Sequence, residues 1–226
     1  MMTKTLLTFP LLASPWARWL IYAAVAVFAA YKLVPGLQAS DSLNGFEIGN
    51  ALVPKSRIER GGPPRDGIPA LTRPAMRVAS DVRYLDASDR VLALSHEGES
   101  RAYPIRILNW HEVVNDTVGG RNVVISYCPL CGTGMVFDAQ VNGQNLEFGV
   151  SGLLYNSDML LYDRQTSSLW SQILAQAISG PLKGSKLSMI AADYTSWQDW
   201  RKQHPDGLVL DKNTGHARDY SRDPYA

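Results

Sequence analysis

Short runs of apolar and β-branched residues, bounded by turn residues, occur between residues 90 and 150, and this pattern predicts strands. The loop between the first two runs contains Gly98, which is typical of a β-hairpin, and Asn142-Gly143 is a turn pair between two later runs. The run that starts at Asn122 is apolar and β-branched enough for a buried strand. The predicted strands cover residues 90–95, 101–106, 122–127, 134–139 and 145–150.

Helical periodicity is limited to three short windows, residues 107–116, 169–178 and 196–203. Thr195 or Ser196 can cap the last window. The roughly 150 residues after residue 75 are enough for one packed core. The pattern therefore predicts an α+β domain, predominantly antiparallel β and barrel- or sandwich-like, with a few short helices.

The N-terminal part of the chain has a different pattern, an apolar stretch from Trp19 to Val34 that only Lys32 interrupts. Its length is about the minimum for crossing a bilayer. Aromatic residues stand near both ends, and basic residues precede it, which favours a cytoplasmic N-terminus. We expect a transmembrane signal anchor over residues 19–36 and a cytoplasmic segment over residues 1–18.

This anchor would make the protein a single-pass protein of the cell membrane, with its C-terminal domain outside the cytoplasm, in the periplasm or the extracellular space. A cleaved signal peptide with processing at Leu37-Gln38-Ala39 is the alternative. Residues 37–74 are rich in Gly and Pro and predict an extended arm. Residues 75–226 are expected to form a single globular domain.

Charge and motifs exclude several classes of function. The formal net charge is +1, and no run of like charges suggests a nucleic-acid surface. The chain has no Walker loop, dinucleotide fingerprint, Gly-x-Ser-x-Gly elbow or His-Glu-x-x-His. Neither nucleic acid nor a nucleotide is an expected partner, and no enzymatic activity can be assigned. The expected partners are the membrane, through the N-terminal helix, and an extracytoplasmic protein.

The strongest candidate chemistry lies in Cys128 and Cys131, the only two cysteines of 226 residues. This C-x-x-C spacing suits a metal ion, a disulfide or a redox pair. In thioredoxin-like proteins the pair opens a helix, whereas here it joins two predicted strands, as in the knuckles of rubredoxin-like and zinc-ribbon sites. Those sites need two knuckles, so four cysteine ligands within one chain are excluded.

A metal would need further ligands, and His111 is the best candidate because an imidazole is costly to bury without a partner. The alternative is a core histidine that only forms hydrogen bonds. Two thiolates and one imidazole suit copper(I) or zinc. Asp158 and Asp163 have two interpretations, a structural ion pair of Asp163 with Arg164, or a carboxylate that faces the cysteines as acid, base or ligand.

Several long segments resemble the bacterial and archaeal family called domain of unknown function 3179. These segments include RAYPIRILNWHEVVNDTVGG, SYCPLCGTGMVFD, FGVSGLLYNSDMLLYDRQTSSLWSQ and TGHARDYSRDPY, in the order of the family. The resemblance covers residues 67–225. It implies an extracytoplasmic or membrane-anchored protein and names no reaction.

Three functions therefore stay open from the sequence. The first, which we favour, is a metal-binding accessory protein that holds copper or zinc through Cys128, Cys131 and His111. The second is a thiol-disulfide oxidoreductase that uses the same cysteines. The third is a non-catalytic scaffold or partner-binding domain with a structural disulfide.

Overall fold

The computed structural model describes residues 15–33 and 41–225, and the chain divides into two compact units, Met1–Asp41 and Ser42–Ala226. The first unit contains α1 (Pro15–Leu33). Within the described ranges, no helix has both the length and the apolar character needed to cross a membrane. The transmembrane anchor expected over residues 19–36 is thus not supported, and its residues 34–36, like residues 1–14 of the expected cytoplasmic segment, lie outside the described ranges. The location outside the cytoplasm stays a prediction.

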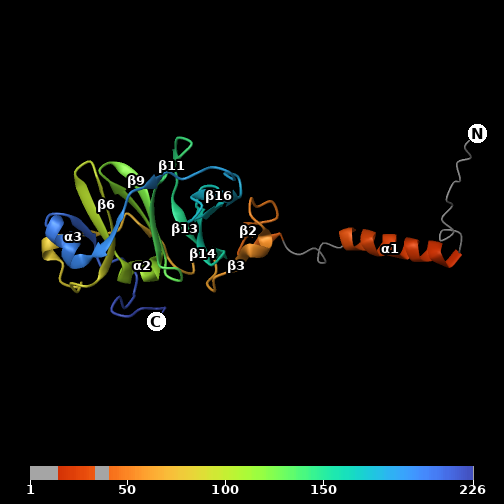
Figure 1. The fold of residues 1–226 in the computed structure, drawn as a ribbon, viewed down its shortest axis with the longest axis horizontal. Helices are drawn as coiled ribbons and strands as arrows, with labels where there is room; N and C mark the ends of the chain where they lie inside the picture. The colour runs from red at the N-terminus through yellow and green to blue at the C-terminus, as the bar shows by residue number, and fades with distance from the viewer. Residues whose placement is uncertain (1–14, 34–40, 226) are drawn as a thin grey trace, which may run out of the picture. The chain divides into compact units, whose positions relative to one another are not determined.

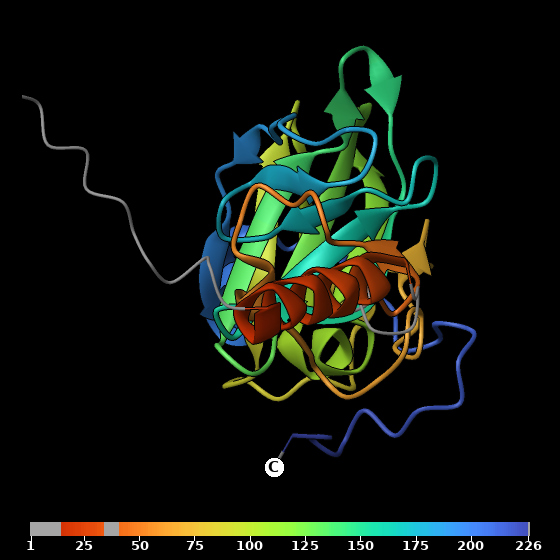
Figure 2. The same cartoon turned by 90° about the vertical axis from the view of Figure 1, so that its right-hand side faces the viewer.

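The second unit is built from three five-stranded sheets (Figures 1 and 2). The β9 sheet has the order β17-β10-β9-β8-β4, and its strands are Met189–Ile190, Thr133–Asp138, Arg121–Cys128, Val113–Val118 and Leu71–Thr72. The β6 sheet has the order β18-β6-β7-β19-β5, with strands Asp193–Ser196, Arg90–His96, Glu99–Pro104, Leu208–Leu210 and Met76–Val78. The β13 sheet has the order β16-β15-β14-β13-β3, with strands Gln176–Ser179, Leu169–Ser171, Asp158–Asp163, Phe148–Tyr155 and Ile58–Arg60.

The remaining elements are short. They are the strand pairs β1 (Ser42–Leu43) with β2 (Phe46–Glu47) and β11 (Gln140–Val141) with β12 (Gln144–Asn145), the helices α2 (Ile105–His111) and α3 (Trp197–Gln203), and the 3-10 turns η2 (Lys55–Arg57) and η3 (Ala79–Asp81). Strand pairing is antiparallel except in β4–β8 and β19–β7. The predicted mostly antiparallel domain with few helices is confirmed, and no sheet of the described residues closes into a barrel.

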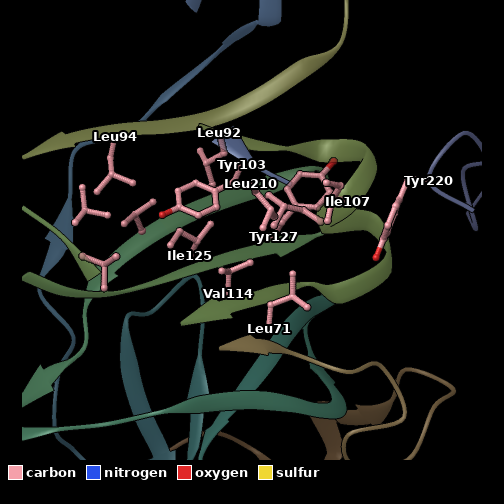
Figure 3. Packing of buried hydrophobic residues seen from close by; sticks show 14 residues of the cluster. Leu71, Leu92, Leu94, Tyr103, Ile107, Val114, Ile125, Tyr127, Leu210 and Tyr220 are labelled. Carbon is pink, nitrogen blue, oxygen red and sulfur yellow. The ribbon is translucent and has the colours of Figure 1, made fainter. Parts of the chain in front are cut away.

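The β9 sheet lies between the other two sheets, so both of its faces are covered. Ile125 of β9 packs with Leu92 and Tyr103 of the β6 sheet, and Figure 3 shows this cluster. Val124 and Cys128 belong to a second cluster, which contains residues of the β13 sheet. Successive side chains of a strand point to opposite faces, and here both faces are apolar, which explains the continuous apolar run of β9.

The outer faces of the stack are covered in different ways. Trp197 and Trp200 of α3 pack on the outer face of the β6 sheet. Phe46 of β2 packs with Leu160 and Tyr162 on the outer face of the β13 sheet. The order from α3 through the three sheets to β2 can be followed in Figure 1.

Residues 42–74, within the segment expected to form an arm, contribute strands to two sheets, since β3 pairs with β13 and β4 pairs with β8. The arm is held by backbone hydrogen bonds at the bulge of β13, where the Gly61 amide donates to the Gly152 carbonyl over 2.9 Å. This segment therefore packs as part of the same compact unit.

Two of the three helical predictions differ from the structure. The window 169–178 contains β15, a turn over residues 172–175 and most of β16, because Trp170 and Ala177 are buried against the β9 sheet. The predicted helix over residues 107–116 starts earlier, at Ile105, and ends at His111, before β8. The helix over residues 196–203 is confirmed as α3, with Ser196 accepting a hydrogen bond from the Asp199 amide as N-cap.

Candidate functional site

The two cysteines lie in the predicted knuckle between two strands. Cys128 is the last residue of β9 and pairs with Thr133, the first residue of β10. The Gly132 amide donates to the Cys128 carbonyl over 2.8 Å and closes the turn. Gly132 has a φ of 68°, and a Cβ there would meet no atom within 4 Å, so glycine serves the backbone conformation and avoids no clash.

Asp158 reaches the cysteines from another sheet. It is the first residue of β14, and the turn Asn156-Ser157 before it has two residues with positive φ, which makes a tight hairpin with β13. Oδ1 of Asp158 lies 3.2 Å from Sγ of Cys131. Oδ2 accepts a hydrogen bond from the Ile173 amide over 3.1 Å, which fixes the carboxylate.

Cys128, Cys131 and Asp158 form a compact group of potential metal ligands. One ligand atom of each residue lies within 4.8 Å of the other two. Cys128 and Asp158 are buried, whereas Cys131 is exposed, and both thiols are free. The group is thus accessible from one side.

The electrostatic surroundings of this group disfavour negative charge when no cation is bound. Burial raises the pKa of the Cys128 thiol to about 12, and the neighbouring Cys131 thiol contributes to the increase. Burial also raises the pKa of Asp158, although hydrogen bonds from Cys131 and the Ile173 amide act against this effect. A bound cation would relieve this cost.

A buried glutamine lies next to the knuckle. Nε2 of Gln172 donates to Oγ of Ser126 over 2.9 Å and to the Thr133 carbonyl over 3.3 Å. These bonds fix the orientation of the Gln172 amide, because the Thr133 carbonyl can only accept and must therefore face the amide nitrogen. Oε1 of Gln172 is then the one buried side-chain oxygen or nitrogen in the described residues without a hydrogen-bond partner. The amide lies near the knuckle, because Thr133, which it contacts, pairs with Cys128.

His111, the third ligand predicted from the sequence, is not part of this group. It is the last residue of α2 and fully buried. Nδ1 lies 2.8 Å from the Pro69 carbonyl, so Nδ1 carries the proton, and Nε2 accepts from the hydroxyl of Tyr220 over 2.7 Å. Its one available lone pair is occupied, as in a core histidine that forms only hydrogen bonds.

The two aspartates considered in the sequence have different roles. Asp163 accepts hydrogen bonds from the Thr166 amide and from Nε1 of Trp170, which stabilises the turn after β14. Arg164 forms ion pairs with Asp66 and Glu147 and not with Asp163. Asp158 is therefore the carboxylate that faces the cysteines.

Glu112 is a further unusual residue near the knuckle, which follows His111 in one of the family-like segments but was not predicted as a site residue. It has a φ of 58° and a ψ of −33° after α2, and its carbonyl accepts from the Tyr127 amide, next to Cys128. Burial raises the pKa of its carboxyl to about 7, and the Tyr225 hydroxyl donates to it over 2.7 Å. Its place beside His111 in the family-like segment is the sequence signal that could have identified it.

The comparisons with known proteins identify a family and no activity. The model of a family described as protein of unknown function, DUF3179, matches residues 65–226. No curated protein and no solved structure matches the chain. The function must therefore be argued from the site.

Proposed function

The chain belongs to the DUF3179 family, and from its own geometry we propose that it binds a zinc ion through Cys128, Cys131 and Asp158. The observation that carries the proposal is the convergence of two sulfur atoms and one carboxylate oxygen within 4.8 Å. Cys128 ends β9 in one sheet and Cys131 lies in the turn after it, whereas Asp158, 27 positions after Cys131, starts β14 in another sheet. The fold therefore brings together three potential metal ligands that are not neighbours in the sequence.

The spacing of the ligand atoms fits one tetrahedral ion. Zinc binds a thiolate at about 2.3 Å and a carboxylate at about 2.0 Å, which separates two such ligands by about 3.5 Å. The sulfur of Cys131 and the oxygen of Asp158 are 3.2 Å apart. A metal would thus need only a small outward movement of this pair.

The carboxylate decides between the two metals expected from the sequence. Copper(I) prefers soft thiolate and thioether ligands, whereas zinc accepts cysteine and aspartate together. Because Asp158, and not the predicted His111, lies with the two cysteines, the ligand set favours zinc over copper(I). Copper(I) becomes the competitor in the experiment below.

Three protein ligands leave the fourth position of a tetrahedral zinc open. Cys131 is exposed, so this position can face solvent and accept water or a ligand from a partner. A water bound to the metal is a hydrogen-bond donor, and within the described residues Oε1 of Gln172 has no donor. Such a site suits an accessory protein that holds and transfers zinc, since an open position allows ligand exchange.

The redox and scaffold alternatives have less support. The buried Cys128 has a raised thiol pKa, whereas a reactive cysteine needs a lowered one. The knuckle also leads into β10 and provides no helix N-terminus for a thiolate. A structural disulfide would require oxidation of the two free thiols.

Metal analysis of the whole protein tests the proposal. The protein is purified under reducing conditions, loaded with zinc or copper(I), and desalted. We expect one zinc per chain, loss of zinc in Cys128→Ser and Asp158→Asn, and retention in His111→Gln. Asp193→Asn, which removes an exposed carboxylate of β18, is the matched control.

Cobalt(II) substitution adds a readout that does not depend on activity. A thiolate-to-cobalt charge-transfer band should appear in the wild-type protein and disappear in Cys131→Ser. Circular dichroism checks that each variant is folded. Retention of zinc in folded Cys128→Ser and Asp158→Asn variants, or preference for copper(I), would overturn the zinc assignment.

A further inference from the structure

A cleft of about 630 Å³ lies outside the cysteine site. Tyr84, Arg106 and residues 212–221, which we call the C-terminal loop, line it. The loop follows β19, and Figures 1 and 2 show the C-terminal segment, in dark blue, as an irregular segment outside the sheets. The volume is within the range of small-molecule sites.

The C-terminal loop is held in place by α2. The Tyr220 hydroxyl donates to His111, and Tyr220 is itself buried at the edge of the apolar cluster in Figure 3. The hydroxyls of Thr214 and Tyr220 form a hydrogen bond of 2.5 Å, which links the two ends of the loop. Beyond the loop, Nε1 of Trp110 donates to the Arg222 carbonyl over 3.1 Å. The C-terminal loop is therefore a wall of the cleft that hydrogen bonds hold in place.

Three cationic side chains and one carboxylate, that of Asp219, lie in the lining. Within the described part of the chain, neither Lys212 nor Arg218 forms an ion pair, and His216 contacts the ring of His111 at 5.2 Å. The third cationic residue, Arg106, is different, because it is paired with Asp89 over 2.5 Å and also with Asp86.

The acidic groups nearby are already engaged. Asp219 is the one acidic residue of the lining, and its carboxylate accepts from the amide and hydroxyl of Ser221. Asp211, just before the loop, is bound to Arg77 over 2.6 Å. Arg218 lies over the ring of Trp110, at 5.5 Å from its centroid, and within the described residues neither Arg218 nor Lys212 has a carboxylate partner, so both can receive an external anion.

The Arg218 guanidinium also acts on the base of the loop. Burial is the main cause that lowers the pKa of His111 to about 4, and the charge of Arg218 lowers it further.

We propose that this cleft binds a phosphate group, either free phosphate or that of a small phosphate monoester, between Lys212 and Arg218. The Lys212 ammonium and the Arg218 guanidinium supply charge-assisted donors to such a group. A tetrahedral dianion has enough acceptor oxygens for donors that approach from several sides, whereas a carboxylate is planar. The site is independent of the cysteine ligands.

Calorimetric titration of the full chain at fixed ionic strength tests the proposal. The probes are inorganic phosphate, glycerol 3-phosphate and, as a carboxylate comparison, succinate. The variants are Lys212→Gln and Arg218→Gln, and both residues are exposed, so folding should be unaffected. Lys202→Gln on α3, which lies outside the cleft lining, is the matched control.

We expect saturable binding of one phosphate probe per chain, weakened about tenfold or more by each cleft variant and unchanged by the control. Tighter binding of inorganic phosphate would identify the free ion as the ligand, and tighter binding of glycerol 3-phosphate would identify a monoester. Absence of saturable binding, equal affinity for succinate, or full affinity in both cleft variants would each overturn the proposal.

Discussion

The carboxylate of Asp158 lies 3.2 Å from the sulfur of Cys131, although the two residues are 27 positions apart. Asp158 starts β14 in the β13 sheet, whereas Cys131 lies in the turn that joins β9 to β10 within the β9 sheet. This contact results from the stacking of two sheets, and the sequence pattern of neither strand predicts it. This contact distinguishes a three-ligand site from an isolated cysteine pair.

Replacing Asp158 with Asn should weaken zinc binding more than about 100-fold. Loss of a residue that only supports a ligand typically costs 10- to 100-fold, and a ligand itself should cost at least as much. Competition with a chromophoric chelator measures the affinity. An Asp158→Asn protein that binds zinc as tightly as the wild type would show that the carboxylate is no ligand.

Gly132→Ala and Gly152→Ala should differ in their effects on stability. Both glycines have positive φ, of 68° and 71°, so each alanine has a backbone cost of roughly 1–2 kcal/mol. A Cβ on Gly152 would also lie 2.1 Å from the Pro63 carbonyl, whereas Gly132 has free space. Urea unfolding of metal-free protein should show the larger loss for Gly152→Ala, and equal losses would contradict this account.

The stability of the protein should decrease in mild acid because of His111. Its pKa is about 4 in the folded protein and about 6.5 in the unfolded chain, so protonation favours unfolding. The contribution, up to about 3 kcal/mol, is present above pH 6.5 and is lost as the pH falls toward 4. Urea unfolding at pH 4.5 and 7.5 should show a smaller difference for His111→Gln than for the wild type. An unchanged difference would argue against a buried neutral imidazole.

Glu112 should have the opposite effect on the pH dependence. Burial raises its pKa from about 4.5 to about 7, so its contribution is present below pH 4.5 and is lost as the pH rises through 7. Glu112→Gln keeps an acceptor for Tyr225 and removes the ionisation. Its free energy of unfolding relative to the wild type should therefore be higher at pH 8 than at pH 5. The same relative stability at both pH values would show that the carboxyl is not buried as described.

Local signals in the sequence were sufficient for the parts of the fold that depend on neighbouring residues. The β6–β7 hairpin, with its turn at Glu97-Gly98, and the cysteine knuckle follow from alternation and turn residues. The turn Asn142-Gly143 was also recognised, but it joins the short β11 and β12 instead of the long strands. The stacking order of the sheets has no such local signal.

The wrong predictions fall where contacts between residues far apart in the sequence determine the structure. Residues 169–178 have a helical spacing of apolar residues, yet Trp170 and Ala177 are buried as strands in the core beside the β9 sheet. For His111, the sequence predicted correctly that a buried imidazole needs partners. It could not show that these partners are Pro69, 42 positions away, and Tyr220, 109 positions away. Asp158 was a candidate but could not be ranked above Asp163.

The burial of β9 on both faces has a consequence for hydrogen exchange. A strand between two covered layers has few ways to open locally, so its amides should exchange only when the whole unit unfolds. Cys128 is the last residue of this strand, so zinc that binds only the folded protein would slow exchange along all of β9. The amides of Val123, Val124 and Ile125 would then report metal affinity from well inside the core, without any probe at the site itself.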